Sequence, residues 1–193
     1  MKVGVVGCAG RMGINLLREA AQTAGCVIGG GTERPGHPAL GRDLGELAGL
    51  ELAGIAVGDD PAALFAAVDA VLDFTLPEAT VAHAALAAEH GTPLVIGTTG
   101  TSAEQDAAIA RAAGRVAIMR GANMSVGVNL LLALTEQVAR LLNEDFDIEI
   151  VEMHHRYKVD APSGTALALG RVAATGRGVE HDAVAVRGRD GIT

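Results

Sequence analysis

Short runs of β-branched residues alternate with alanine-rich stretches between residues 2 and 119. The β-branched runs predict strands at residues 2–7, 26–31, 68–74, 94–96 and 116–119. The stretches between them predict helices at residues 11–23, from Asp60-Pro61 onward, at 77–90 and at 102–114. Residues 34–58, rich in glycine and proline, predict an irregular connection with one short strand. This alternation is typical of a parallel sheet covered by helices, so we expect an α/β fold.

The pattern changes in the last third of the chain. Residues 126–142 predict a long helix, residues 147–155 a long strand with a charged end, and Ser163 the start of a second helix. Residues 175–193 are polar and predict no closing element. We therefore expect two domains: a doubly wound parallel sheet at residues 1–125 and a smaller α+β lobe at residues 126–193.

Composition narrows the classes of function. Hydrophobic residues make up 49% of the 193 residues and charged residues 20%, which excludes a disordered chain. Aromatic residues are only 2% and the net charge is -8, which argues against nucleic acids and anionic membranes as partners. Two cysteines, Cys8 and Cys26, make no disulfide framework, so we expect a cytoplasmic protein.

A glycine-rich loop lies between the first predicted strand and the first predicted helix: Gly7-Cys8-Ala9-Gly10-Arg11-Met12-Gly13. Glycines at such a turn let the backbone approach a pyrophosphate, and the helix N-terminus behind them offers free N–H groups to an anion. The spacing is G-x-x-G-x-x-G rather than G-x-G-x-x-G, and a glycine turn without a ligand is the alternative. We expect a Rossmann-type dinucleotide-binding domain.

The second predicted strand is followed by Glu33 and Arg34. An acidic residue there can accept hydrogen bonds from the ribose hydroxyls of NAD, whereas an arginine can pair with the 2′-phosphate of NADP. The two together predict a site that tolerates both cofactors or favours either one. For Arg34, a solvated charge at a strand end is the alternative.

Cations gather in one segment of this acidic chain: His154, His155, Arg156 and Lys158. Such a cluster suits a small polyanion, for example a dicarboxylate, and a histidine with a lysine can act as an acid/base pair. Ser163-Gly164-Thr165 then opens a helix whose N–H groups and hydroxyls can bind a carboxylate.

Three alternatives apply to this segment. The histidine pair could bind a metal, but neighbours on a strand point to opposite faces and no third ligand recurs, so we expect none. The cations could form an ordinary solvated edge. Ser163 could be a nucleophile activated by Lys158, although nothing nearby resembles an oxyanion elbow.

The residues from Glu149 to Ala166 match the pattern E-I-x-E-x-H-x-x-x-K-x-D-x-P-S-G-T-A at every fixed position. This pattern closely resembles the signature of the 4-hydroxy-tetrahydrodipicolinate reductase (dihydrodipicolinate reductase) family. The resemblance extends along nearly the whole chain in the family's order: residues 7–13, 33–34, 73–75, 97–100 and 123–129. A pattern of this length is highly specific.

The resemblance implies a role for each matching residue. It implies His154 as the acid/base residue and Lys158 as the proton donor. Cofactor-binding residues are implied at Gly7, Cys8, Ala9, Gly10, Arg11, Met12, Glu33, Arg34, Gly97, Thr98, Thr99, Gly121, Ala122, Asn123 and Met124. Substrate-binding residues are implied at His155, Gly164 and Thr165.

The implied activity is reduction of 4-hydroxy-tetrahydrodipicolinate to tetrahydrodipicolinate with NADH or NADPH, in lysine biosynthesis via diaminopimelate. The cofactor carries the hydride, while the protein fixes two carboxylates and delivers a proton. The family also implies a cytoplasmic homotetramer joined through the second lobe.

The family's pattern continues for some tens of residues beyond the last residue of this sequence. We therefore expect a second lobe that is incomplete relative to the family, either as a fragment or as a shortened variant. Two alternatives to the reductase remain: a nicotinamide-dinucleotide-binding protein without this turnover, and a reductase of another imine or semialdehyde.

Overall fold

The computed structural model describes every residue except 143, 155, 157–159, 189–190 and 193. The chain divides into two compact units, Met1–Ala122 and Asn123–Thr193. Within the described residues, no helix is long and apolar enough to cross a membrane.

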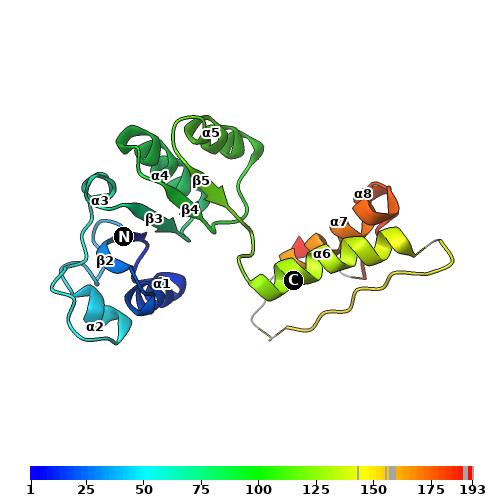
Figure 1. The fold of residues 1–193 in the computed structure, drawn as a ribbon, viewed down its shortest axis with the longest axis horizontal. Helices are drawn as coiled ribbons and strands as arrows, with labels where there is room; N and C mark the ends of the chain where they lie inside the picture. The colour runs from blue at the N-terminus through cyan, green and yellow to red at the C-terminus, as the bar shows by residue number, and fades with distance from the viewer. Residues whose placement is uncertain (143, 155, 157–159, 189–190, 193) are drawn as a thin grey trace. The chain divides into compact units, whose positions relative to one another are not determined.

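The first unit is built on a five-stranded parallel sheet in the order β2-β1-β3-β4-β5 (Figure 1). Its strands are β1 (Lys2–Val6), β2 (Val27–Thr32), β3 (Ala70–Asp73), β4 (Leu94–Ile96) and β5 (Ile118–Arg120). The chain passes from β1 to β2 on one side and returns to β3 on the other side of β1, so the strand order reverses beside β1. Ligands bind at such a switch point in open α/β sheets, outside the carboxyl ends of the strands. The predicted doubly wound α/β fold is confirmed.

Helices cover both faces of this sheet: α1 (Arg11–Gln22), α2 (Leu44–Ala48), α3 (Pro61–Ala67), α4 (Pro77–His90) and α5 (Ala103–Ala113). Neighbouring strand residues point to opposite faces, and Val5 and Val6 accordingly belong to two different core clusters. Val5 packs in a cluster with Leu17 of α1 and Leu44 of α2. Val6 packs in the cluster that holds Phe65 of α3 and residues of α4 and α5.

One helix of the first unit is absent from the sequence prediction. Residues 34–58 were expected to be irregular, but Leu44–Ala48 form α2. The Asp43 carboxylate caps this helix by accepting the N–H groups of Gly45 and Glu46, and it also accepts those of Ala53 and Ile55. These bonds to residues ten or more positions away hold the connection in place.

The second unit contains α6 (Val126–Leu141), α7 (Gly164–Arg177), the short α8 (His181–Val184), and a two-stranded antiparallel sheet of β6 (Asp160–Ala161) and β7 (Gly191–Ile192). Ser125 and Ser163 cap α6 and α7 with their hydroxyls. Gly176 lets the two helices approach closely, because a Cβ there would lie 2.5 Å from the Glu136 carbonyl oxygen. The prediction that residues 175–193 hold no closing element is wrong, since α8 and β7 lie there.

The predicted strand at residues 147–155 is also wrong over residues 147–154, and residue 155 lies outside the described residues. Residues 147–154 belong to no strand, and Figure 1 shows them as an extended trace after α6. A strand needs a neighbour that accepts and donates its backbone hydrogen bonds, and the described residues place none beside this segment. The alternation persists in the side chains, since Ile150 is 40% exposed and Val151 is 88% exposed.

Candidate functional site

The glycine-rich loop connects β1 to α1 at the switch point of the sheet. Gly7 has φ +66°, a conformation that favours glycine. Gly13 packs directly on the loop, because a Cβ there would lie 2.2 Å from the Gly7 carbonyl oxygen. Gly10 is the N-cap of α1 and no side chain caps that end. The first-turn N–H groups of α1 are thus available to an anion.

Glu33 is fixed against this loop. Its Oε1 accepts a hydrogen bond from the Ala9 N–H at 2.9 Å, and its Oε2 accepts one from the Arg34 N–H at 3.3 Å. Because β2 neighbours β1, the carboxylate lies beside the glycine loop, where a dinucleotide's adenosine ribose is bound in doubly wound folds. Arg34 is exposed next to it.

Cys8 lies in the same loop but is fully buried among Leu17, Leu44 and their neighbours. Burial, reinforced by the charge of Glu33, raises the pKa of its thiol to about 12. Cys8 therefore contributes packing and its backbone to the loop, and its thiol stays protonated.

The predicted nicotinamide-side residues follow the neighbouring strands. Gly97, Thr98 and Thr99 come directly after β4, and Gly121 and Ala122 after β5. The Gly97 N–H donates to the Asp73 carbonyl oxygen, and the Gly121 N–H donates to that of Ile96. Parallel strands bring these ends to one edge of the sheet, together with Gly7. Asn123 and Met124 belong to the second unit, where the Asn123 side chain accepts the Ser125 N–H.

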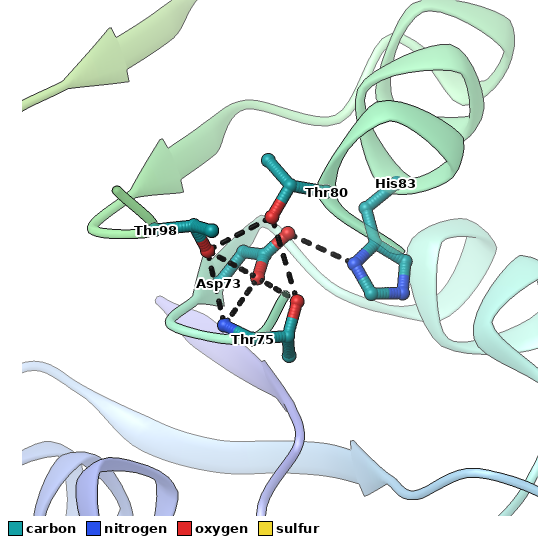
Figure 2. Close-up of polar contacts among 5 residues, drawn as sticks. All are labelled: Asp73, Thr75, Thr80, His83 and Thr98. Atoms are coloured by element: carbon teal, nitrogen blue, oxygen red, sulfur yellow. Dashed lines mark hydrogen bonds and ion pairs between the residues drawn. The ribbon is translucent and has the colours of Figure 1, made fainter. Parts of the chain in front are cut away.

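Behind the loops after β3 and β4 lies a buried polar cluster around Asp73 (Figure 2). Asp73 Oδ1 accepts hydrogen bonds from the Thr75 N–H at 2.9 Å and the Thr75 hydroxyl at 2.6 Å, and Oδ2 lies 2.9 Å from His83 Nδ1. The Thr98 hydroxyl lies 3.4 Å from Asp73 Oδ1 and accepts bonds from the Thr75 N–H and the Thr80 hydroxyl. Sequence reasoning assigned no role to Asp73, Thr75, Thr80 or His83.

The Asp73 side chain is completely buried, and burial alone raises the pKa of a carboxyl. Hydrogen bonds from His83 and Thr75, together with the charge of His83, outweigh this effect and hold the pKa of Asp73 below its usual value. Asp73 therefore keeps its negative charge beneath the loops.

In the second unit, His154 is connected to the start of α7 through Glu152. His154 Nδ1 lies 3.5 Å from one Glu152 oxygen, and the other oxygen accepts the Ser163 N–H at 2.7 Å. Gly164 and Thr165 form the first turn of α7. Glu152 thus joins the candidate site, although the sequence prediction gave it no role within the quoted pattern. Lys158 and His155 lie outside the described residues.

A doubly wound sheet with a glycine loop at its switch point and an acidic residue after the second strand defines a dinucleotide-binding protein. Family models described as "Dihydrodipicolinate reductase, N-terminus" and "Dihydrodipicolinate reductase, C-terminus" match residues 1–124 and 127–192. The chain belongs to the dihydrodipicolinate reductase family, whose members are NAD(P)H-dependent oxidoreductases of lysine biosynthesis.

Individual relatives agree with this assignment. The 4-hydroxy-tetrahydrodipicolinate reductase of Ruegeria pomeroyi is 55% identical over 98% of this chain and 70% of its own length. That of Rhodopseudomonas palustris (strain BisB18) is 51% identical over 100% of this chain and 71% of its own length. Among solved structures, dipicolinate-bound dihydrodipicolinate reductase from Paenisporosarcina sp. TG-14 is similar with a TM-score of 0.72 and 26% identity, over 92% of this chain and 66% of that one.

Proposed function

We propose that this chain reduces 4-hydroxy-tetrahydrodipicolinate to tetrahydrodipicolinate with NADH or NADPH, in lysine biosynthesis via diaminopimelate. The observation that supports this most directly is the connection of His154 through Glu152 to the N-terminus of α7. With this connection, a group able to exchange protons would stand beside a helix end suited to carboxylates. A dicarboxylate imine requires both.

The first unit would hold the cofactor, which supplies a hydride when bound. The backbone of residues 7–12 and the first turn of α1 would hold the pyrophosphate, and residues 97–99 and 121–124 would line the nicotinamide side. Glu33, which accepts the Ala9 N–H, would also accept hydrogen bonds from the ribose hydroxyls, and the exposed Arg34 would pair with a 2′-phosphate. We infer that both NADH and NADPH are used.

The second unit would hold the substrate. Gly164 and Thr165 would bind a carboxylate with the N-terminal N–H groups of α7, assisted by His155. Glu152 engages His154 Nδ1, so His154 Nε2 would exchange protons with the substrate, and Lys158 would donate the proton that accompanies the hydride.

We also propose that the protein is cytoplasmic and assembles as a homotetramer. Both cysteines are free, as a reducing cytoplasm requires. The family resemblance supports a homotetramer, which light scattering of the purified protein would test.

Steady-state kinetics and cofactor titrations test the catalytic roles together. We expect His154→Gln and Lys158→Ala each to lower kcat by about 100-fold or more, because general acid/base groups contribute about 10² to 10⁴. NADH affinity should stay within about threefold of wild type, since neither side chain is assigned to the cofactor. His90→Gln, the same change on the exposed end of α4, is the matched control and should leave both quantities unaltered. Loss of NADH binding together with turnover would contradict the assigned roles, and NADH binding without oxidation in the wild type would favour a non-catalytic protein.

A further inference from the structure

The Asp73 cluster contacts both the glycine-rich loop and residues 97–99, the two segments of the first unit that we propose hold the cofactor. At one end, Thr75 touches the glycine-rich loop, because a Cβ on Gly7 would lie 2.7 Å from Thr75 Cγ2. At the other end, the Thr75 N–H donates to the Thr98 hydroxyl at 3.0 Å, inside the segment 97–99. The residue that links these contacts is Asp73, which accepts two hydrogen bonds from Thr75 and lies 3.4 Å from the Thr98 hydroxyl.

The cluster is more than a packing feature, because burying a carboxylate carries a large desolvation penalty that an uncharged side chain would avoid. Asp73 is fully buried, and so are Thr80 and, nearly so, Thr98. If an apolar side chain stood in place of Asp73, it could fill the same volume between the three threonines without burying a charge. An ionised acceptor instead makes shorter, stronger and more directional bonds to Thr75 than a neutral one.

His83 completes the support from the side away from the loops, as Figure 2 shows. Its Nδ1 lies 2.9 Å from Asp73 Oδ2, and its ring stacks on Phe65 with centroids 6.3 Å apart. Phe65 is part of the core, so its contact with His83 ties the Asp73 carboxylate to the core. Asp73 in turn bonds to Thr75 and Thr98.

We propose that Asp73 is a positioning residue for the nicotinamide cofactor, which holds the glycine-rich loop and residues 97–99 in the register that lets one dinucleotide contact both. The proposal rests on the proposed function only in requiring a nicotinamide dinucleotide. Neither the Thr98 hydroxyl nor the Asp73 carboxylate needs to touch the cofactor, since both are turned into the cluster.

Calorimetric titration with two ligands tests this directly. NADH needs both loops, whereas ADP-ribose lacks the nicotinamide and needs only the glycine-rich loop and Glu33. We expect wild type to bind NADH more tightly than ADP-ribose, and Asp73→Asn to reduce this affinity ratio about tenfold, because it keeps the shape but loses the charged acceptor. Binding needs no substrate, so failure of the proposed turnover would not affect the outcome.

Thr98 supplies a second test if Asp73→Asn does not fold. Thr98→Val removes the hydroxyl and should lower the NADH to ADP-ribose affinity ratio. Thr98→Ser keeps the hydroxyl and should leave this ratio close to that of wild type. Thr23→Val is the control, because it also removes a threonine hydroxyl that donates to a backbone carbonyl oxygen, that of Glu19, at the C-terminal end of α1. It should lower stability and leave the ratio unchanged.

Turnover gives an independent readout where the protein is active. Misplacing the nicotinamide should slow hydride transfer, so Asp73→Asn should lower kcat about 10- to 100-fold and raise the isotope effect with NADH deuterated at the transferred position. A wild-type affinity ratio near one would overturn the proposal. So would variants at Asp73 and Thr98 that lose stability but keep the ratio and the isotope effect of wild type.

Discussion

Replacing Gly13 with alanine would bring a side chain into the backbone of the glycine-rich loop. A Cβ at Gly13 would lie 2.2 Å from the Gly7 carbonyl oxygen and 2.6 Å from Cys8 Cα, whereas real Cβ atoms essentially never approach closer than 3.0 Å. The glycine-rich loop and α1 must therefore separate by about 0.8 Å, and both obstacles are backbone atoms that no rotamer change can move. Overpacking of this kind costs about 1 to 3 kcal/mol.

This displacement should affect both stability and cofactor binding. For a chain of this length, about 1 to 3 kcal/mol corresponds to a Tm lower by about 2 to 12 °C. The N–H groups at the start of α1 would move relative to the loop, so NADH affinity should fall at least about tenfold. Thermal denaturation and calorimetric titration with NADH measure the two effects.

Gly58→Ala is the matched control, because no atom lies within 4 Å of a Cβ at that position. It should leave NADH affinity unchanged and leave Tm unchanged or slightly raised, since alanine reduces the entropy of the unfolded chain. Wild-type NADH affinity in Gly13→Ala, or an equal loss of Tm in both variants, would show that the loop and α1 do not have to separate.

Three further predictions concern chemistry and stability of the first unit. Iodoacetamide at about pH 8 should alkylate Cys26 and spare Cys8, whose pKa is raised to about 12, as peptide mass spectrometry would show; equal labelling would contradict this. Ser102→Ala should lower Tm by about 2 to 4 °C through loss of the capping box with Gln105, whereas Ser102→Asn should restore most of it in the same thermal scans. Because the folded-state pKa of Asp73 is lowered, its ionisation stabilises the fold above the unfolded pKa of about 3.9, and this contribution disappears as pH falls through the folded pKa. In urea denaturation, the stability difference between wild type and Asp73→Asn should therefore be constant at neutral pH and shrink below about pH 4, and a difference that grows on acidification would argue against the assignment.

The elements that the sequence predicts well are those whose signals are local. Asp60-Pro61 caps and begins α3, Ser102 and Gln105 form a capping box on α5, and Gly91 ends α4 in the left-handed conformation. Each signal lies within a turn or two of the helix end that it specifies. The glycine-rich loop is predictable for the same reason, since spacing alone places it between a strand and a helix.

The elements that the sequence misses depend on distant partners. The helix α2 has five residues, too few to show a periodic pattern, and it is held by Asp43 bonds to Ala53 and Ile55. Residues 147–154 have the composition of a strand, but composition cannot provide the neighbouring strand on which pairing depends. Pairing is a tertiary property even where extended conformation is a local one.

The Asp73 cluster was missed for a related reason. An aspartate at a strand end is usually an exposed residue, and nothing local reveals that this one is fully buried. Its partners come from three elements: Thr75 from the loop after β3, Thr80 and His83 from α4, and Thr98 from the loop after β4. Only the parallel pairing of β3 with β4 brings these loops together.

An anionic dinucleotide and two carboxylates carry charge of the same sign, but each carboxylate at this edge of the sheet is bonded to donors of the protein. Glu33 directs one oxygen at the Ala9 N–H and can offer the carboxylate to neutral ribose hydroxyls, away from the phosphates. Asp73 is buried behind Thr75 and Thr98 and lies against His83, so its negative charge interacts with donors inside the protein. The phosphates would meet the uncapped N-terminus of α1 instead. The two acids can therefore fix the loops without facing the ligand's charge, which is why an amide at position 73 should disturb cofactor geometry without relieving any repulsion.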